Sequence, residues 1–91
     1  MKTRAHIFVR GKVQGVFFRS ETLRVARKQS VNGWIRNLPN GEVEAILEGE
    51  EEDINKIIAF CKSGPSGAKV TGIRLTLEDY SGKFADFEIR P

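Results

Sequence analysis

Gly11-Lys12-Val13-Gln14-Gly15-Val16-Phe17-Phe18-Arg19 is the stretch around which the rest of the chain is arranged. It contains two glycines, which allow the backbone to turn, and no acidic residue, and it ends on an arginine. Before it, residues 4–10 alternate between apolar and mostly polar side chains, which predicts a strand that Gly11 ends. After it, from about Arg19, the apolar residues recur with a helical period. The stretch is therefore predicted to connect a strand to a helix.

A strand-to-helix connection of this composition is a candidate anion site. Backbone amides at a helix N-terminus lack intrahelical partners, and the helix dipole favours a negative charge there. Glycines let an anion approach the backbone closely, and Arg19 adds a planar fork that can bind two oxygens at once. A plain turn with a solvated arginine is the alternative. The spacing fits neither a Walker loop nor a Rossmann fingerprint.

The remaining chain predicts a first helix over residues 19–31, stopped by Asn32-Gly33, and a hairpin with strands at 34–38 and 42–48 around the Asn40-Gly41 turn. Gly49 should break the second strand, whose glutamates face away from its apolar side chains. A second helix follows from the acidic run 50–53 to about residue 63. Residues 70–78 predict a strand with Ile73, Leu75 and Leu77 facing inward, and residues 84–90 predict the last strand.

This order predicts an α+β fold, the ferredoxin-like split βαβ sandwich. It consists of βαββαβ plus a short last strand, with two helices on one face of a mixed antiparallel sheet. The first and third strands should be central neighbours, whereas the pattern leaves the partner of the last strand open. Residues 1–91 are expected to form a single domain.

Composition excludes several classes of protein. A net charge of +3 favours anionic partners but lacks the charge density of a dedicated nucleic-acid binder. The single cysteine, Cys61, permits no internal disulfide and lies on an apolar helical stripe, which indicates an inert core thiol. Consecutive carboxylates at 50–53 point in different directions around a helix, so no metal is expected there. Since no apolar run has the length of a membrane span or signal peptide, we expect a cytoplasmic protein without membrane contact.

Asn37, at the end of a predicted strand, is the second candidate site residue. Its amide offers an acceptor and two donors, enough to hold a water molecule, although an asparagine that merely precedes a turn is the alternative. His6 is the only histidine and lies within a predicted strand. No catalytic triad and no zinc or calcium spacing can be assembled.

Taken together, these two stretches resemble the acylphosphatase family. Its first motif, Gly-x-Val-Gln-Gly-Val-x-Phe-Arg, is matched by Gly11 to Arg19 at every fixed position. Its second motif is matched by Gly33, Trp34, Asn37, Gly41, Val43 and Gly49. Two later features of the family are also present, Gly64-Pro65 after the second predicted helix and the closing Phe87-x-Ile89. Two positions differ from the family pattern. Ile35 is bulkier than the usual residue, and Ser30 stands where relatives often have a helix-ending glycine.

The resemblance implies hydrolysis of the carboxyl–phosphate bond of acyl phosphates, giving a carboxylate and inorganic phosphate. Arg19 would be the catalytic, phosphate-binding arginine and Asn37 would orient the attacking water. The backbone amides of Gln14, Gly15, Val16, Phe17 and Phe18 would form the phosphate cradle. The expected partners are a small-molecule acyl phosphate and inorganic phosphate as product and inhibitor. We expect a monomer without metal or cofactor.

The sparse site suits this reaction. A carboxylate is a good leaving group, and phosphoryl transfer depends mainly on positioning and charge stabilisation. We therefore hypothesise that the substrate itself accepts the proton of the water.

Two alternatives remain open at this point. RNA-recognition modules share the topology and stack bases on sheet aromatics, for which Phe8 and Phe84 are candidates, but their signature run is absent. Gly64 to Gly67 imitates the clamp of a KH domain but joins a helix to a strand.

The other alternative is carbamoyl-phosphate handling, as in the acylphosphatase-like domain of hydrogenase-maturation proteins. Those domains are segments of much larger chains, whereas this chain has 91 residues.

Overall fold

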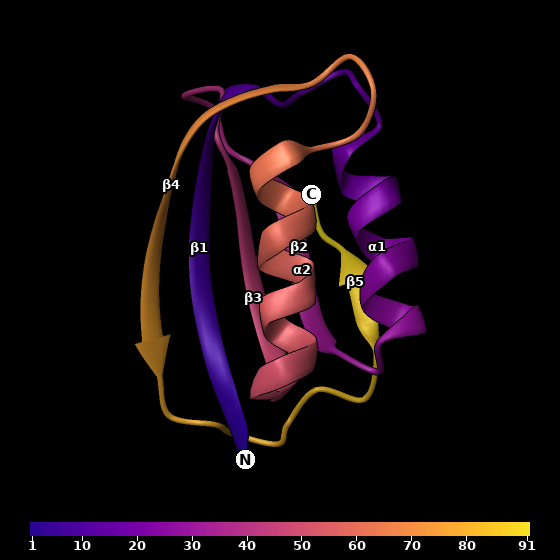
Figure 1. Cartoon of the computed structure of the whole chain (residues 1–91), viewed down its shortest axis with the longest axis vertical. Coiled ribbons are helices and arrows are strands. Elements are labelled where there is room, and N and C mark those ends of the chain that lie inside the picture. Colours follow the sequence, from indigo (N-terminus) through magenta and orange to yellow (C-terminus); the bar gives the residue numbers. More distant parts are fainter.

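A computed structural model describes all 91 residues (Figure 1). The elements follow one another as β1 (Lys2–Lys12), α1 (Phe18–Lys28), β2 (Asn32–Asn37), β3 (Val43–Glu50), α2 (Glu51–Ser63), β4 (Lys69–Glu78) and β5 (Phe87–Ile89). No helix is long and apolar enough to cross a membrane.

The five strands form one sheet in the order β4-β1-β3-β2-β5, and both helices cover the same face of it (Figure 1). β1 pairs antiparallel with β3 and β4, and β3 pairs antiparallel with β2. β5 pairs parallel with β2, which makes the sheet mixed. The predicted ferredoxin-like fold is confirmed, with the first and third strands as central neighbours. The open question of the last strand is answered, since its partner is β2.

The hydrophobic core lies between the helices and the sheet. β1 and β3 supply alternate apolar residues, and the helices supply one stripe each. Ile35, one of the two residues that depart from the family pattern, is fully buried in this core and does not line the cavity described below. Burying each large aliphatic or aromatic side chain contributes about 1.5–3 kcal/mol, so this layer holds the helices on the sheet. The fully buried side chains include Ile7, Val9, Phe18, Ile35, Leu47, Ile54, Ile57 and Phe87.

The first strand does not end at Gly11, as the sequence predicted, but continues to Lys12. Its register with β4 shifts between Arg10 and Gly11, which marks a β-bulge. Gly11 has φ 123°, and a Cβ there would lie 2.0 Å from the carbonyl oxygen of Lys69. Glycine is therefore required where the bulge redirects the chain toward the following loop.

The predicted end of the first helix was also wrong, because α1 stops at Lys28 and not near residue 31. The amide of Ser30 donates to the carbonyl of Arg27 and the amide of Val31 to that of Ala26, which is a Schellman motif. Ser30 takes the left-handed position with φ 58°, where glycine is usual. Asn32 and Gly33, predicted as a stop, are the first residues of β2.

The sheet face opposite the helices carries a partly buried layer of ion pairs. Glu44 and Glu48 were predicted on a polar, outward face of β3, yet they are only 6% and 2% exposed. Glu44 accepts hydrogen bonds from His6 and Arg36, and Glu48 from Ser81 and Gly82. The long side chains of neighbouring strands, together with the segment after β4, cover the glutamates. β3 also does not break at Gly49 and runs on to Glu50.

The two outer strands differ most from the sequence prediction. β5 spans only Phe87–Ile89 and not residues 84–90, because the chain before it crosses the end of the sheet as a loop bound to Glu48. Leu75 and Leu77 of β4 lie opposite Ile7 and Ala5 of β1 and so share the helix-covered face. They were predicted to be buried but are 48% and 66% exposed, since β4 is an edge strand beyond the cover of the helices.

Candidate active site

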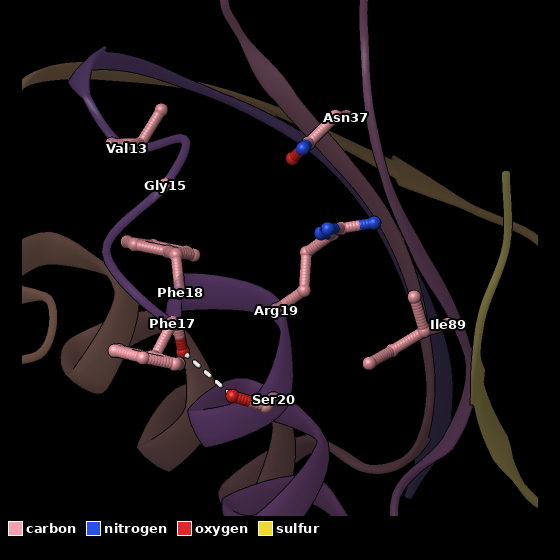
Figure 2. A pocket seen from close by; sticks show the side chains of 8 residues that line it. All are labelled: Val13, Gly15, Phe17, Phe18, Arg19, Ser20, Asn37 and Ile89. Carbon is pink, nitrogen blue, oxygen red and sulfur yellow. Dashed lines mark hydrogen bonds between the residues drawn. The ribbon is translucent and has the colours of Figure 1, made fainter.

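A cavity of about 380 Å³ lies where the β1–α1 loop, the end of β2 and β5 meet (Figure 2). It brings together Arg19 and Asn37, the two side chains that the sequence singled out. Gly15, Phe17 and Phe18 of the predicted cradle also line it. Val13, Ser20 and Ile89 complete the lining and were not predicted as site residues.

The β1–α1 loop presents a row of free backbone donors. Gly15 and Phe17 both take left-handed conformations, with φ 74° and φ 61°, and the helix begins directly after Phe17. None of the amides from Gln14 to Phe17 donates a hydrogen bond to a backbone or side-chain acceptor of the chain. The amides of Phe18 and Arg19 open α1 and have no acceptor one turn earlier within the helix. Such a turn followed by a helix N-terminus is a nest suited to an anion.

Arg19 differs from every other arginine of the chain. The other seven each lie within 4.0 Å of a carboxylate, whereas Arg19 has no acidic partner. Arg19 lies in the first turn of α1, half-buried, and its guanidinium extends into the cavity toward Asn37 (Figure 2). A partly buried cation without a counterion, beside free amides, gives the cavity a positive potential that favours an anionic ligand.

Asn37 is the last residue of β2, and its side chain projects into the cavity from the side opposite the helix (Figure 2). Its Oδ1 is buried and has no hydrogen-bond partner. A buried acceptor left unpaired costs about 1–3 kcal/mol, so such an atom usually meets a water or a ligand. Asn37 is therefore placed to hold a small polar molecule next to whatever Arg19 binds.

The side chain of Gln14 makes two hydrogen bonds that its position in the motif did not predict. Its Nε2 donates to the carbonyl oxygens of Leu38 at 2.8 Å and Glu42 at 3.0 Å, on either side of the β2–β3 turn. These two bonds tie the β1–α1 loop to the segment that follows Asn37, and so hold the two halves of the cavity together. Val16 lines a second hollow on the α2 side, so its side chain does not face this cavity.

The cavity contains a single ionisable side chain. No histidine, cysteine, aspartate or glutamate lines it, so no side chain there can act as a general base. His6 lies between Glu44 and Glu78 on the other face of the sheet. Cys61 is buried in the core, where burial raises the pKa of its thiol to about 12. No group of side chains in the chain has the arrangement of a metal site. The arrangement can bind a phosphoryl group and position a water.

Sequence and structure comparisons give a consistent match. The family model for acylphosphatase matches residues 5–89. An acylphosphatase of Syntrophus aciditrophicus is 51% identical over 89 residues, covering 98% of this chain and 93% of the relative. The crystal structure of the Bacillus subtilis acylphosphatase superposes with a TM-score of 0.94 at 33% identity, covering all of both chains. Full-length HypF, in a phosphate- and nucleotide-bound form, matches with a TM-score of 0.87 and 26% identity, over 12% of its own chain.

Proposed function

This chain belongs to the acylphosphatase family and is an enzyme that hydrolyses acyl phosphates, and on that premise we propose that Arg19 and Asn37 are its catalytic residues. One observation carries the proposal. The only arginine without a carboxylate partner and the buried, unpaired Oδ1 of Asn37 line the same cavity. No other part of the chain combines an unpaired cation with an unpaired acceptor in one cavity.

In this proposal the phosphoryl group of the substrate sits between the β1–α1 loop and Arg19. The free amides from Gln14 to Phe18 donate to its oxygens, and the guanidinium of Arg19 binds two of them at once. These donors are in place before the substrate arrives, so little reorganisation is needed as charge shifts in the transition state. Inorganic phosphate has the same oxygens and should therefore inhibit competitively.

Asn37 holds the attacking water in the same cavity. The water oxygen forms a bond to phosphorus while the bond from phosphorus to the acyl oxygen breaks, and its electron pair leaves with the carboxylate. A proton of the water passes to a phosphoryl oxygen of the substrate, giving a carboxylate and inorganic phosphate. No lining side chain can act as a general base, which supports transfer of the water proton to the substrate. The leaving carboxylate needs no proton, so the site requires no general acid either. A pH–rate profile that shows an essential protein base near neutrality would argue against it.

The direct test compares hydrolysis of benzoyl phosphate by the wild type, Arg19→Ala and Asn37→Ala. We expect each variant to lose more than ~100-fold in kcat/KM, the scale of losing one transition-state contact. Arg24→Ala is the matched control, because Arg24 lies on the same helix but pairs with Glu21 in solvent. Unchanged rates in folded Arg19→Ala and Asn37→Ala would refute the assignment.

The alternatives are less well supported. The acylphosphatases match this chain over their full or nearly full length, whereas the HypF match covers 12% of that protein. For nucleic-acid stacking, Phe8 is already covered by the guanidinium of Arg74, 4.5 Å from its ring centre. That the enzyme acts in the cytoplasm as a monomer stays a prediction.

A further inference from the structure

We infer that Ile89 forms the wall of a subsite for the acyl group, and that this enzyme favours acyl phosphates whose acyl group is apolar and bulky. This inference rests on the proposed function, because it takes the positions of phosphate and water from Arg19 and Asn37. Ile89 is an apolar side chain of β5 that lines the cavity and is 39% exposed.

The direction of attack decides where the acyl group lies. In phosphoryl transfer the attacking and leaving oxygens stand roughly in line on opposite sides of phosphorus. If Asn37 holds the water, the acyl oxygen leaves on the side of the phosphoryl group away from Asn37. Figure 2 shows Asn37 on one side of the Arg19 side chain, and Phe17, Ser20 and Ile89 on the other. The acyl group is therefore directed toward the side of the cavity that these three residues line, and Ile89 is the aliphatic side chain among them.

The size of the cavity leaves room for such a group. Three phosphoryl oxygens, the leaving acyl oxygen and a water amount to five water-sized atoms, which need roughly 150 Å³ at about 30 Å³ for each. The cavity has about 380 Å³, so more than half of it is not required by the reacting atoms. A ring or a branched chain fits this remainder, whereas an acetyl group leaves much of it to water.

The lining on that side selects against charge. Arg19 is the only charged residue of the cavity, and the phosphoryl group engages it. Arg90, the cation directly after β5, pairs with Glu88 at 3.0 Å and lies over the ring of Trp34. No cation thus remains to receive a second carboxylate on the acyl group. The hydroxyl of Ser20 donates to the carbonyl of Phe17 at 3.2 Å, so its proton is already engaged.

A second hollow is the competing location for the acyl group. It lies on the α2 side of the β1–α1 loop, and it includes Val16, Phe60 and Pro65. An acyl group bound there would have to pass over the loop, out of line with a water held by Asn37. The geometry therefore favours the Ile89 side of the cavity, and Phe60→Ala tests the hollow on the α2 side.

The experiment measures kcat/KM for benzoyl phosphate, acetyl phosphate and succinyl phosphate in the wild type, Ile89→Ala, Leu75→Ala and Phe60→Ala. Leu75 is the matched control, because it is a half-exposed aliphatic residue on the opposite edge strand. We expect Ile89→Ala to lower the benzoyl-to-acetyl ratio by ~10-fold, the lower end for losing apolar contact in a pocket. Leu75→Ala and Phe60→Ala should leave that ratio within ~2-fold of the wild type, and the wild type should use succinyl phosphate least well.

Ile89→Thr, which keeps the branched shape, covers the case in which Ile89→Ala does not fold, and a smaller fall of the same ratio is expected. The inhibition constant of inorganic phosphate should stay unchanged in both variants, because phosphate contacts the loop and Arg19. A constant ratio in folded Ile89 variants, or a changed ratio in Phe60→Ala alone, would overturn the inference. Retained activity in Arg19→Ala would instead count against the proposed function, so the two failures are distinguishable.

Discussion

Replacing Glu48 by glutamine should destabilise the protein although Glu48 lies on the sheet face away from the cavity. The carboxylate is buried and accepts hydrogen bonds from the Ser81 amide at 3.0 Å, the Ser81 hydroxyl at 2.8 Å and the Gly82 amide at 3.1 Å. Burial alone would raise the pKa of Glu48, but these bonds and the charge of Arg4 outweigh it and hold the pKa below its ordinary value of 4.5. The carboxylate thus anchors the segment that leads to β5.

The expected loss follows from the donors that surround the two oxygens. A glutamine presents one oxygen and one NH₂ group, so at least one of the three donors loses its acceptor, at a cost of about 1–3 kcal/mol. The remaining bonds lose their charge assistance, while the variant no longer buries a charge, and these two effects partly cancel. We therefore expect Glu48→Gln to lower the free energy of unfolding by about 2 kcal/mol.

Urea denaturation at neutral pH measures this loss, with Glu88→Gln as control because Glu88 pairs with Arg90 in solvent and should cost less than ~1 kcal/mol. The pH dependence has a defined sign. Between the lowered folded pKa of Glu48 and 4.5, the unfolded chain holds a proton that the native chain does not. The stabilisation is thus complete above that window and disappears as pH falls through it. A loss in the free energy of unfolding below about 0.5 kcal/mol at neutral pH would refute this account of Glu48, because substitutions of surface residues have effects of that size.

Three further predictions concern single residues. Ser30→Gly should raise the free energy of unfolding by about 0.5–1 kcal/mol, because glycine takes φ 58° without a Cβ clash, and a lower midpoint in urea would contradict this. Gln14→Leu should lower kcat/KM by ~10-fold with unchanged far-UV circular dichroism, because the loop loses its two bonds to the β2–β3 turn, and full activity would contradict that role. Cys61 should react with a thiol reagent only as fast as the chain unfolds, since burial raises its pKa to about 12, and rapid reaction of the native protein would contradict its placement.

The central elements were predictable because their signals are local and repeated. The alternation in β1 and β3, the helical stripe ending at Cys61 and the Asn40-Gly41 turn each specify one element, and together they specify the order of the fold. Arg19 was predictable for the same reason, since its place at a strand-to-helix connection follows from the change of period at Gly15 to Phe18. The position of Asn37 at the end of a predicted strand made it a candidate, and the second motif then paired it with Arg19.

The parts that were wrong depend on contacts between distant segments. Leu75 alternates as a buried residue does, but its exposure depends on how far the helices extend over an edge strand. Glu48 is buried because residues after β4 return to it, and no pattern within β3 contains that information. Ile89 faces the cavity only because β5 pairs with β2, a parallel pairing that the sequence left open.

The division of labour between Arg19 and Asn37 is tested most directly by measuring two quantities in the same two variants. These are the inhibition constant of inorganic phosphate and kcat with benzoyl phosphate. Arg19→Ala should weaken phosphate inhibition by ~10–100-fold, the equivalent of a lost charge-assisted contact of about 1.5–3 kcal/mol. Asn37→Ala should lower kcat by more than ~100-fold while phosphate inhibition stays within ~2-fold of the wild type. Equal weakening of phosphate binding in both variants, or wild-type kcat in Asn37→Ala, would contradict the account.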